Sequence, residues 1–435
     1  MDEENTMDKV FPDDLLIVDL GESTKPSIIK VIGVGGGGDN AVANMYREGI
    51  REVKIVACNT DRKALEDSPI PNRLQLGPGL GAGGNPENGR YYAEEDIEKI
   101  RAELDESTKM VFITAGMGGG TGTGASPIIA REAKAKGILT VGIVTIPFLF
   151  EMNRQIDKAL KGVENLAKEV DAILIINNER LKEVYTDLSV PNAFKKADMT
   201  LTNAVGAIME FITMHGLMNL DFHDVDMVLR NGGVAIISSG YGSGTHRIKK
   251  AIDAALNSPL LNDTDVYRAK RLAMLFTTPR DANKAVTIEE YQNEVTEFMN
   301  HCNPDVETKW GYQEADDLEE DVKVTILASG FSLYDQPKKE DAPEEVDDYE
   351  NAVRRDRFYG KEKGAKRQKR YQIFTYDMDN LEDEALWKLV DDVPTALRER
   401  NKLKEMQEKV TEKRTISPEP EESVITAGQT FDMRD

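Results

Sequence analysis

Cysteine, positive charge and long apolar runs are scarce in this chain. Cys58 and Cys302 are its only cysteines among 435 residues, and their wide separation supports neither a disulfide framework nor a zinc site. No uncharged apolar run reaches the length of a membrane span, about 18 residues, and residues 1–14 are acidic rather than basic and then apolar. We therefore expect a cytoplasmic protein with reduced cysteines and no direct membrane insertion.

The shortage of positive charge limits the partners of the protein. Lys and Arg number 55 against 78 Asp and Glu, which gives a formal net charge of −23. Such a charge repels the phosphate backbone of nucleic acids, so no nucleic-acid partner is expected. An anionic ligand would have to be held locally, by loops and a metal ion. Apolar residues make up 40% of the chain, enough to bury a core in two or three domains.

Glycine is concentrated in two loops. The first reads GVGGGGDN from Gly33 to Asn40, and the second reads GGGTGTG from Gly118 to Gly124. Each follows an apolar run typical of a strand and precedes a segment with helical periodicity. A strand, a glycine turn and a helix start place backbone N–H groups at the positive end of a helix dipole, which favours an anion. Two such loops on one sheet predict a site for a nucleotide polyphosphate.

Short runs rich in Val and Ile alternate with helical segments in residues 27–191. This alternation predicts an α/β domain with a parallel sheet covered on both faces. The expected strands are 28–32, 54–59, 110–114, 139–146 and 172–177, and the expected helices are 41–48, 93–104, 125–136 and 154–167.

A long helical pattern follows at 192–215, and we interpret residues 192–221 as a central helix with a loop that connects two domains. Residues 222–334 mix both kinds of element, which predicts a second α+β domain. Its expected helices are 246–257 and 287–300, and its expected strands are 234–239, 273–277 and 322–328.

The two ends of the chain are polar. Residues 1–26 are interpreted as a flexible acidic arm, and residues 335–380, with an acidic block and then a basic block, as a disordered charged linker. An apolar island at 381–400 predicts a peptide that folds on a partner, with a frayed helix packed on the chain's own core as the alternative. Residues 401–435 form a charged tail. The basic block at 354–370 is interpreted as solvated, with contact to anionic lipid as the alternative.

The first loop alone leaves two functions open. Glycines 33, 35 and 38 fit G-x-G-x-x-G, and Asp61 follows the next expected strand where a dinucleotide enzyme places its ribose-binding acid. A Rossmann dehydrogenase is therefore one alternative, and a purely structural turn is another. Neither explains the second loop, whose glycines admit a phosphate and whose threonine hydroxyls can donate to it. No P-loop motif occurs in the chain.

The segment after the central helix carries two carboxylates three residues apart, in the pattern Asn219-x-Asp221-x-x-Asp224. Asp221 and Asp224 could cap the next helix and stabilise its dipole. They could instead orient a water molecule and a cation for phosphoryl hydrolysis. The central helix separates them from the glycine loops by roughly 35 Å, so one subunit could scarcely use both sites.

Together these motifs resemble the FtsZ family of bacterial, tubulin-like cell-division GTPases. The run from Gly118 to Gly124 matches the family's G-G-G-T-G-T-G signature, and Asn219, Asp221 and Asp224 match its N-x-D-x-x-D loop. The likeness extends from about residue 28 to residue 331. The resemblance implies head-to-tail filaments in which the acid loop of one subunit enters the nucleotide pocket of the next, and it favours catalysis over capping for Asp221 and Asp224.

The resemblance also implies roles for individual residues. It places Asn40 and Asp198 on the guanine edge, Phe194 against the base, and Glu151 on the ribose, with Arg154 nearby. Without it, Phe194 and Asp198 would be interpreted as core and surface positions of a helix. The residues implied to contact the phosphates are Gly35, Gly36, Gly37, Gly118, Gly119, Gly120, Thr121, Gly122, Thr123 and Gly124.

Two segments depart from the family pattern. The family reads T-x-P-F-x-F-E-G-x-x-R after the fourth core strand, whereas this chain has Met152 in place of the glycine and its arginine, Arg154, one residue early. The peptide around Asp392-Val393-Pro394 resembles the family's C-terminal partner-binding peptide, but Thr395-Ala396 replaces an apolar pair and a charged tail follows.

These observations predict a self-assembling GTPase that binds GTP and GDP with Mg²⁺ and hydrolyses GTP at the subunit interface. The expected partners are further copies of the chain and a membrane-tethered division adaptor bound through 381–400, at the mid-cell division site. No metal site built from protein side chains is expected. A member of the same fold that binds GTP and assembles without hydrolysing it is the remaining alternative.

Overall fold

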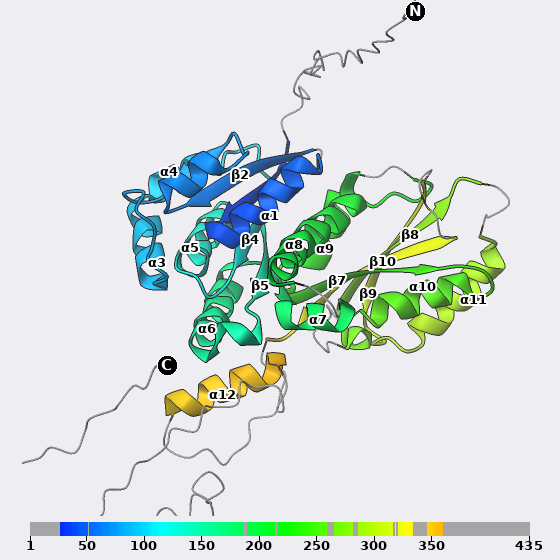
Figure 1. Ribbon diagram of the computed structural model, residues 1–435. Helices are drawn as coiled ribbons and strands as arrows, with labels where there is room; N and C mark the ends of the chain where they lie inside the picture. The colour runs from blue at the N-terminus through cyan, green and yellow to red at the C-terminus, as the bar shows by residue number, and fades with distance from the viewer. Residues whose placement is uncertain are drawn as a thin grey trace, which may run out of the picture. The chain divides into compact units, whose positions relative to one another are not determined.

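One mixed sheet organises the molecule. The structure is a computed structural model, and it describes residues 27–50, 52–185, 189–213, 216–258, 265–281, 286–315, 318, 321–333 and 346–359. Within these residues the sheet has ten strands in the order β3-β2-β1-β4-β5-β6-β7-β10-β8-β9. Figure 1 shows the helices arranged around it. The acidic arm, the partner-binding peptide and the charged tail expected from the sequence lie outside the described residues.

The strands are β1 Ile29–Val34, β2 Val53–Asn59, β3 Arg73–Gln75, β4 Met110–Gly116, β5 Leu139–Ile146, β6 Ala172–Asn177, β7 Gly233–Gly242, β8 Arg271–Pro279, β9 Glu307–Ala315 and β10 Val322–Phe331. The helices are α1 Gly35–Arg47, α2 Arg62–Asp67, α3 Pro86–Glu95, α4 Ile97–Glu103, α5 Thr121–Ala135, α6 Asn153–Glu169, α7 Leu181–Val184, α8 Val190–Thr213, α9 Phe222–Leu229, α10 Arg247–Leu256, α11 Ile288–Met299 and α12 Val346–Tyr359. Short 3-10 turns are η1 Leu149–Glu151, η2 Asn178–Arg180 and η4 Val266–Arg268.

The first six strands are parallel to their neighbours. Strands β1, β5 and β6 are buried at every position, as expected where helices cover both faces of a parallel sheet. The expected α/β fold is confirmed. Because the strands run in one direction, the glycine loops after β1 and β4 emerge at the same edge.

The second set of strands continues the same sheet. Strand β7 runs parallel to β6, with Ala172 opposite Gly233 and Ile173 opposite Val234, and β10 then pairs antiparallel with both β7 and β8. Helix α8 packs its buried Val205, Ile208 and Met209 into an apolar cluster that draws on both sets of strands. It begins two residues before the expected 192–215, its described part runs to Thr213, and it is the expected long helix. None of the described helices has the length and apolarity to cross a bilayer.

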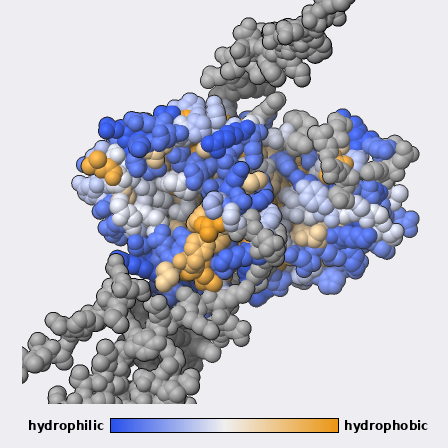
Figure 2. All heavy atoms as spheres, viewed as in Figure 1, coloured by the Kyte–Doolittle hydropathy of each residue, from blue (hydrophilic) through white to orange (hydrophobic). Residues whose placement is uncertain are grey.

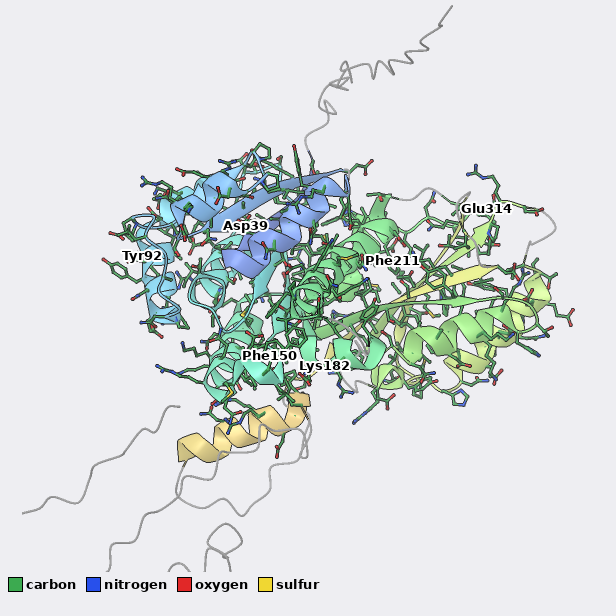
Figure 3. The ribbon with its side chains drawn as sticks, viewed as in Figure 1. Asp39, Tyr92, Phe150, Lys182, Phe211 and Glu314 are labelled. Carbon is green, nitrogen blue, oxygen red and sulfur yellow. The ribbon has the colours of Figure 1, made fainter. Side chains whose placement is uncertain are left out.

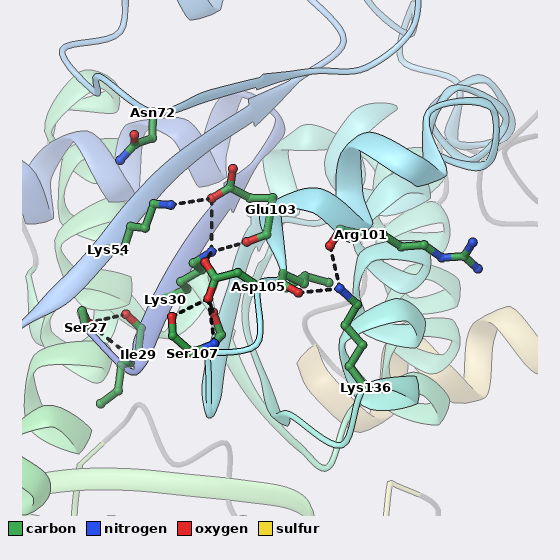
Figure 4. Close-up of polar contacts among 12 residues, drawn as sticks. Ser27, Ile29, Lys30, Lys54, Asn72, Arg101, Glu103, Asp105, Ser107 and Lys136 are labelled. Atoms are coloured by element: carbon green, nitrogen blue, oxygen red, sulfur yellow. Dashed lines mark hydrogen bonds and ion pairs between the residues drawn. The ribbon is translucent and has the colours of Figure 1, made fainter.

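A buried lysine fixes the edge of the sheet opposite the glycine loops. Lys30, near the start of β1, is 1% exposed, and its Nζ donates to the backbone carbonyl of Glu103 and, at 2.7 Å, to the Asp105 carboxylate (Figure 4). Burial works against ionised Asp105, but the hydrogen bonds from Lys30, Ser107 and Thr108 and the Lys30 charge together outweigh it and hold the pKa of that carboxyl well below its usual range. The contacts satisfy a buried charge and tie the end of α4 to β1.

Replacing Lys30 by methionine is expected to lower the free energy of unfolding by about 2 kcal/mol, because a buried carbonyl and a carboxylate lose their donor. Urea unfolding measures this change. Lys54→Met is the matched control, since Lys54 is 41% exposed and its ammonium approaches the Glu103 carboxylate at 3.4 Å, the same distance as that of Lys30. Its expected effect is below about 0.5 kcal/mol. An equal loss of unfolding free energy in the two variants would contradict the conclusion that the buried Lys30 ammonium ties α4 to β1.

The interpretation of residues 335–380 as a disordered linker is wrong for residues 346–359, which form helix α12. This helix packs on α6, where Arg354 Nε lies 2.7 Å from Glu164 Oε1, and it ends in Tyr359, which is 4% exposed. The basic block was interpreted as solvated because the sequence shows its positive charges but not the acidic side chains that pair with them. Its acidic partners lie on α6, about 190 residues earlier in the chain.

Candidate nucleotide-binding and catalytic sites

The two glycine loops meet at the carboxyl edge of β1 and β4. The strands are neighbours, with Val34 opposite Ala115, and α1 begins directly after β1. A Cβ added to Gly37 would lie 3.1 Å from Cα of Gly116, and one added to Gly35 would lie 2.7 Å from the backbone nitrogen of Gly122. The first turns of α1 and α5 therefore contact each other backbone to backbone.

Both helices begin without a side-chain cap. Their N-cap residues are Val34 and Gly120, neither of which has a side chain that accepts a hydrogen bond from the first turn, and neither first turn carries an acidic residue. Side chains cap α2, α3, α9 and α11, whereas α4, α6, α7 and α10 also begin without a side-chain cap, so what distinguishes α1 and α5 is that their uncapped starts adjoin. Uncapped N–H groups at two adjoining helix starts form a positive concavity that suits an anion such as a phosphate.

The glycines of these loops serve two different purposes. A Cβ added to Gly36 or Gly119 would meet no atom within 4 Å, so these two face open space. Gly120 and Gly124 are instead required for packing, because their Cβ atoms would lie 2.8 Å from Ala82 Cβ and 2.0 Å from the carbonyl oxygen of Pro86. Gly118 has φ +106°, a conformation that favours glycine.

The threonines of the second loop tie the loop to its surroundings. Thr121 Oγ1 lies 2.6 Å from Thr60 Oγ1, and Thr123 Oγ1 accepts a 2.8 Å hydrogen bond from the backbone N–H of Gly118. Both side chains are buried. The structure therefore gives each hydroxyl a structural partner, which fixes the backbone that faces the open concavity.

The start of α8 places an acid beside α1. Asp198 is half-buried and accepts a hydrogen bond from the side chain of Asn40 on α1. Burial raises the pKa of Asp198 to about 7, partly offset by the Asn40 hydrogen bond. Thr202, one turn later, is buried and donates to the carbonyl oxygens of Ala41 and Asp198. The structure thus brings together Asn40 and Asp198, which are 158 positions apart in the sequence.

An aromatic cluster lies beside this acid. Phe194 packs edge-on against buried Phe148, with ring centroids 5.4 Å apart, and Phe150 stacks on Phe148 at 5.0 Å. Lys182 Nζ lies 5.6 Å from the centroid of Phe150 (Figure 3). Figure 2 shows an apolar patch near α6 and α7 on this face, where Figure 3 places the half-exposed Phe150. Phe194 is itself partly exposed, as a ring that stacks on a ligand must be.

The segment between β5 and α6 folds back on itself. Glu151 is half-buried, and its Oε1 accepts a 3.0 Å hydrogen bond from the Phe148 N–H. Burial raises the pKa of Glu151, and the Phe148 hydrogen bond lowers it. Arg154 is exposed, whereas Gln155 lies against the second glycine loop, with its Cγ 3.1 Å from the Cβ position of Gly118. The sequence interpretation did not assign Gln155 to the site. Its signal was the arginine that comes one residue early, because this leaves Gln155 at the position of the family's arginine.

The acid loop lies beyond the other end of α8 and forms a complete helix cap. Asp221 Oδ1 accepts hydrogen bonds from the backbone N–H groups of His223 and Asp224, and Asp224 Oδ2 accepts one from the N–H of Asp221. Asn219 Oδ1 accepts from the N–H of Gly216 at 2.6 Å. The capping interpretation is confirmed as geometry. The cap does not decide whether the same carboxylates also act in catalysis.

Strand β9 holds this loop in place. Met218 and Tyr312 exchange two backbone hydrogen bonds, and Lys309 Nζ lies 2.7 Å from Asp224 Oδ1. Burial opposes ionisation of Asp224, but the hydrogen bonds from Lys309 and the Asp221 backbone lower its pKa below the ordinary value. Lys309 could not be predicted from the sequence, because nothing local pairs it with a residue 85 positions earlier.

Within the described residues, no cluster of three or more His, Cys, Asp or Glu side chains could hold a metal ion. The two candidate sites lie at opposite ends of α8: Phe194 and Asp198 are near its start, and Asn219 to Asp224 follow its end. From Asp198 to the last residue of the helix is roughly 22 Å along its axis.

Uncapped helix starts on adjacent parallel strands, with an acid and an aromatic ring beside them, define a nucleotide-binding α/β protein. Residues 28–186 match the model of the Tubulin/FtsZ family, GTPase domain, and residues 233–332 match that of the FtsZ family, C-terminal domain. The chain belongs to the FtsZ family and is a GTPase, which excludes the dehydrogenase alternative.

The relatives cover most of the chain. The cell division protein FtsZ of Porphyromonas gingivalis is 51% identical over 326 residues, which span 74% of this chain and 71% of that protein. FtsZ of Aquifex aeolicus is 41% identical over 317 residues, 72% of this chain and 85% of that one. The solved FtsZ dimer from M. jannaschii has a TM-score of 0.64 at 38% identity and covers 71% of this chain and 89% of that one.

The packing glycines and the open glycines should respond differently to an added methyl group. Gly124→Ala is expected to lower the free energy of unfolding by about 2 kcal/mol or more, because its Cβ would meet backbone atoms of α3. Gly119→Ala is expected to change it by less than about 1 kcal/mol. Urea unfolding of the two variants in the absence of nucleotide tests the assignment, which a large loss in Gly119→Ala would contradict.

Proposed function

We propose that the protein is a cell-division GTPase that assembles head to tail and hydrolyses GTP between two copies of the chain. One observation carries this proposal: the candidate nucleotide site and the acid loop lie at opposite ends of the rigid helix α8. An acid loop fixed to β9 cannot reach the nucleotide site of its own subunit. A neighbour stacked along the same axis can supply it, which is a heterologous contact that propagates into a filament.

The nucleotide-binding roles follow from the chemistry of each group. The uncapped starts of α1 and α5 would bind the phosphates, with Gly36 and Gly119 facing them. Ionised Asp198 would accept both N1–H and the 2-amino group of guanine, a pair of donors that adenine lacks. Phe194 would lie against the base and Glu151 would bind the ribose. We assign the place beside the phosphate loop to Gln155 rather than to Arg154, because Gln155 lies against Gly118.

The catalytic role of the acid loop is to orient a water molecule. The water attacks the γ-phosphorus, the bond to the β–γ bridging oxygen breaks, and GDP and phosphate result. Asp221 and Asp224 would hold the water in line, and Asn219 would fix the loop. Asp224 is a weak base, since its pKa is lowered and it is paired with Lys309. Mg²⁺ would be held mainly by the nucleotide phosphates, where it offsets their charge.

The cellular role is proposed from the relatives. Close relatives are named cell division proteins, and a solved FtsZ is a dimer, which supports self-association and action at the mid-cell division site in the cytoplasm. A membrane-tethered adaptor would bind the peptide at 381–400, which lies outside the described residues. Such a peptide would link the filament to the membrane without inserting into it.

Two defective variants should restore each other's activity if the site is shared. Asp224→Asn keeps the oxygen that caps α9 but loses the charge, so turnover is expected to fall by about a hundredfold or more. Asp198→Ala is expected to fail in binding guanine. In an equal mixture, about a quarter of the contacts join an intact pocket to an intact acid loop, so GTP turnover should recover to about that fraction.

Wild-type turnover per subunit should also appear only above the protein concentration at which the protein sediments. Phosphate release and pelleting are measured on the same samples. A mixture that stays inactive, together with turnover that does not depend on concentration, would show that the site lies within one subunit. Asp224→Asn with unaltered turnover would instead support an assembly protein whose acid loop is structural.

Guanine affinity should depend on pH through Asp198. Because burial raises its pKa to about 7, the empty protein holds Asp198 mostly protonated below that pH, whereas guanine requires the carboxylate. GDP affinity is therefore expected to rise by up to about tenfold per pH unit as the pH approaches 7 and to level off above it. Calorimetric titration from pH 5.5 to 8, below the assembly concentration, tests this. The Asp198→Asn variant should bind GDP weakly, with an affinity that does not change with pH. If its GDP affinity rose with pH as steeply as that of the wild type, Asp198 would be excluded as the titrating group.

A further inference from the structure

The C-terminal helix α12 reaches the rim of the proposed nucleotide site through one buried side chain. Tyr359, its last residue, is 4% exposed, and its hydroxyl donates a 2.6 Å hydrogen bond to the carbonyl oxygen of Pro147. The two residues are 212 positions apart in the sequence. Figure 1 shows α12 next to α6, whose first turn follows the same segment.

Pro147 lies between α12 and the groups that would contact the nucleotide. On one side its Cγ is 3.2 Å from the Cβ position of Gly118 in the second glycine loop. Its chain neighbour Phe148 donates its N–H to the Glu151 carboxylate and accepts a hydrogen bond from the Glu151 N–H. A shift of the Pro147 carbonyl would therefore move the turn that aims Glu151.

Further contacts fix the position of Tyr359. The Asn177 side chain, at the end of β6, donates a 2.6 Å hydrogen bond to the carbonyl oxygen of Phe358. Arg355 Nη1 lies 3.1 Å from both carboxylate oxygens of Asp157 on α6, and Arg354 pairs with Glu164 on the same helix. Burial, with the nearby Glu151 and Glu179 carboxylates, raises the pKa of Tyr359, so its hydroxyl remains a neutral donor.

We propose that Tyr359 is a positioning residue of the nucleotide site: by holding the Pro147 carbonyl, helix α12 sets the Pro147–Glu151 turn in the geometry that binds the ribose. The inference rests on the proposed function, since it needs a nucleotide at the glycine loops and Glu151 at its ribose. In this proposal helix α12, which precedes the C-terminal peptide in the chain, supports the GTP site. The affinity for the ribose then depends on whether α12 is docked.

The test compares two ligands on full-length protein below the assembly concentration. GDP carries the ribose hydroxyls that Glu151 would bind, and 2′,3′-dideoxy-GDP lacks them. Tyr359→Phe keeps the buried ring and removes only the donor. It is expected to weaken GDP binding by about fivefold, the effect of one lost hydrogen bond, and to leave dideoxy-GDP binding unchanged. Tyr267→Phe is the matched control, because it removes a hydroxyl from a partly buried tyrosine packed on Phe298 in another cluster, and it should alter neither affinity.

Each outcome decides the proposal. Equal weakening for both ligands would show that Tyr359 merely supports the fold, and no change for either would show that the Pro147 contact is irrelevant; both would overturn the inference while leaving the proposed function intact. A wild-type protein that does not bind GDP would overturn the proposed function and the inference together. Arg355→Gln, which weakens α12 docking without touching Tyr359, is expected to shift GDP affinity in the same direction, and it replaces Tyr359→Phe if that variant fails to fold.

Discussion

The close approach of two helix starts, backbone to backbone, is the constraint on which this molecule depends. Gly35 and Gly37 of α1 meet Gly122 and Gly116 at distances that leave no room for a side chain. Two positive helix ends then share one edge of the sheet, an arrangement that repels itself unless an anion lies between them. The phosphates of the proposed nucleotide would lie where these two helix ends meet, and their negative charge would offset the repulsion.

Much of this arrangement could be predicted from the sequence. Runs of Val and Ile between helical segments gave the parallel strands, and GGGTGTG gave the second loop, because both signals are local. The strands β3 and β9 were not predicted. Strand β3 has only three residues, and β9 is an amphipathic run that contains Trp310 and Tyr312; both resemble loops when the neighbouring strands are unknown. The packing roles of Gly120 and Gly124 were also hidden, because they depend on where α3 lies. Only some glycines of the signature are therefore placed to contact a ligand, and the others are required by packing.

The helix cap formed by the acid loop is compatible with the catalytic role proposed for it. Asp221 and Asp224 cap α9 with three backbone hydrogen bonds, and Lys309 holds Asp224 from β9. These contacts lock both carboxylates in fixed positions, which a residue that must orient a water molecule in a neighbouring subunit requires. The cap that the structure shows and the proposed catalytic role, which the sequence presented as alternatives, would thus use the same preorganised geometry.

Helix α12 adds a third element to the nucleotide end of the molecule. Its ion pairs with α6 are partly exposed, and such pairs contribute about 0–1 kcal/mol each. The buried ring and hydroxyl of Tyr359 supply a larger share, about 2 kcal/mol or more. Among the described side chains of the helix, Tyr359 therefore contributes a large share of the docking, and it contacts the turn that carries Glu151. Nucleotide binding and helix docking would then be linked at this turn, because any preference of the nucleotide for the docked turn would also favour docking of the helix.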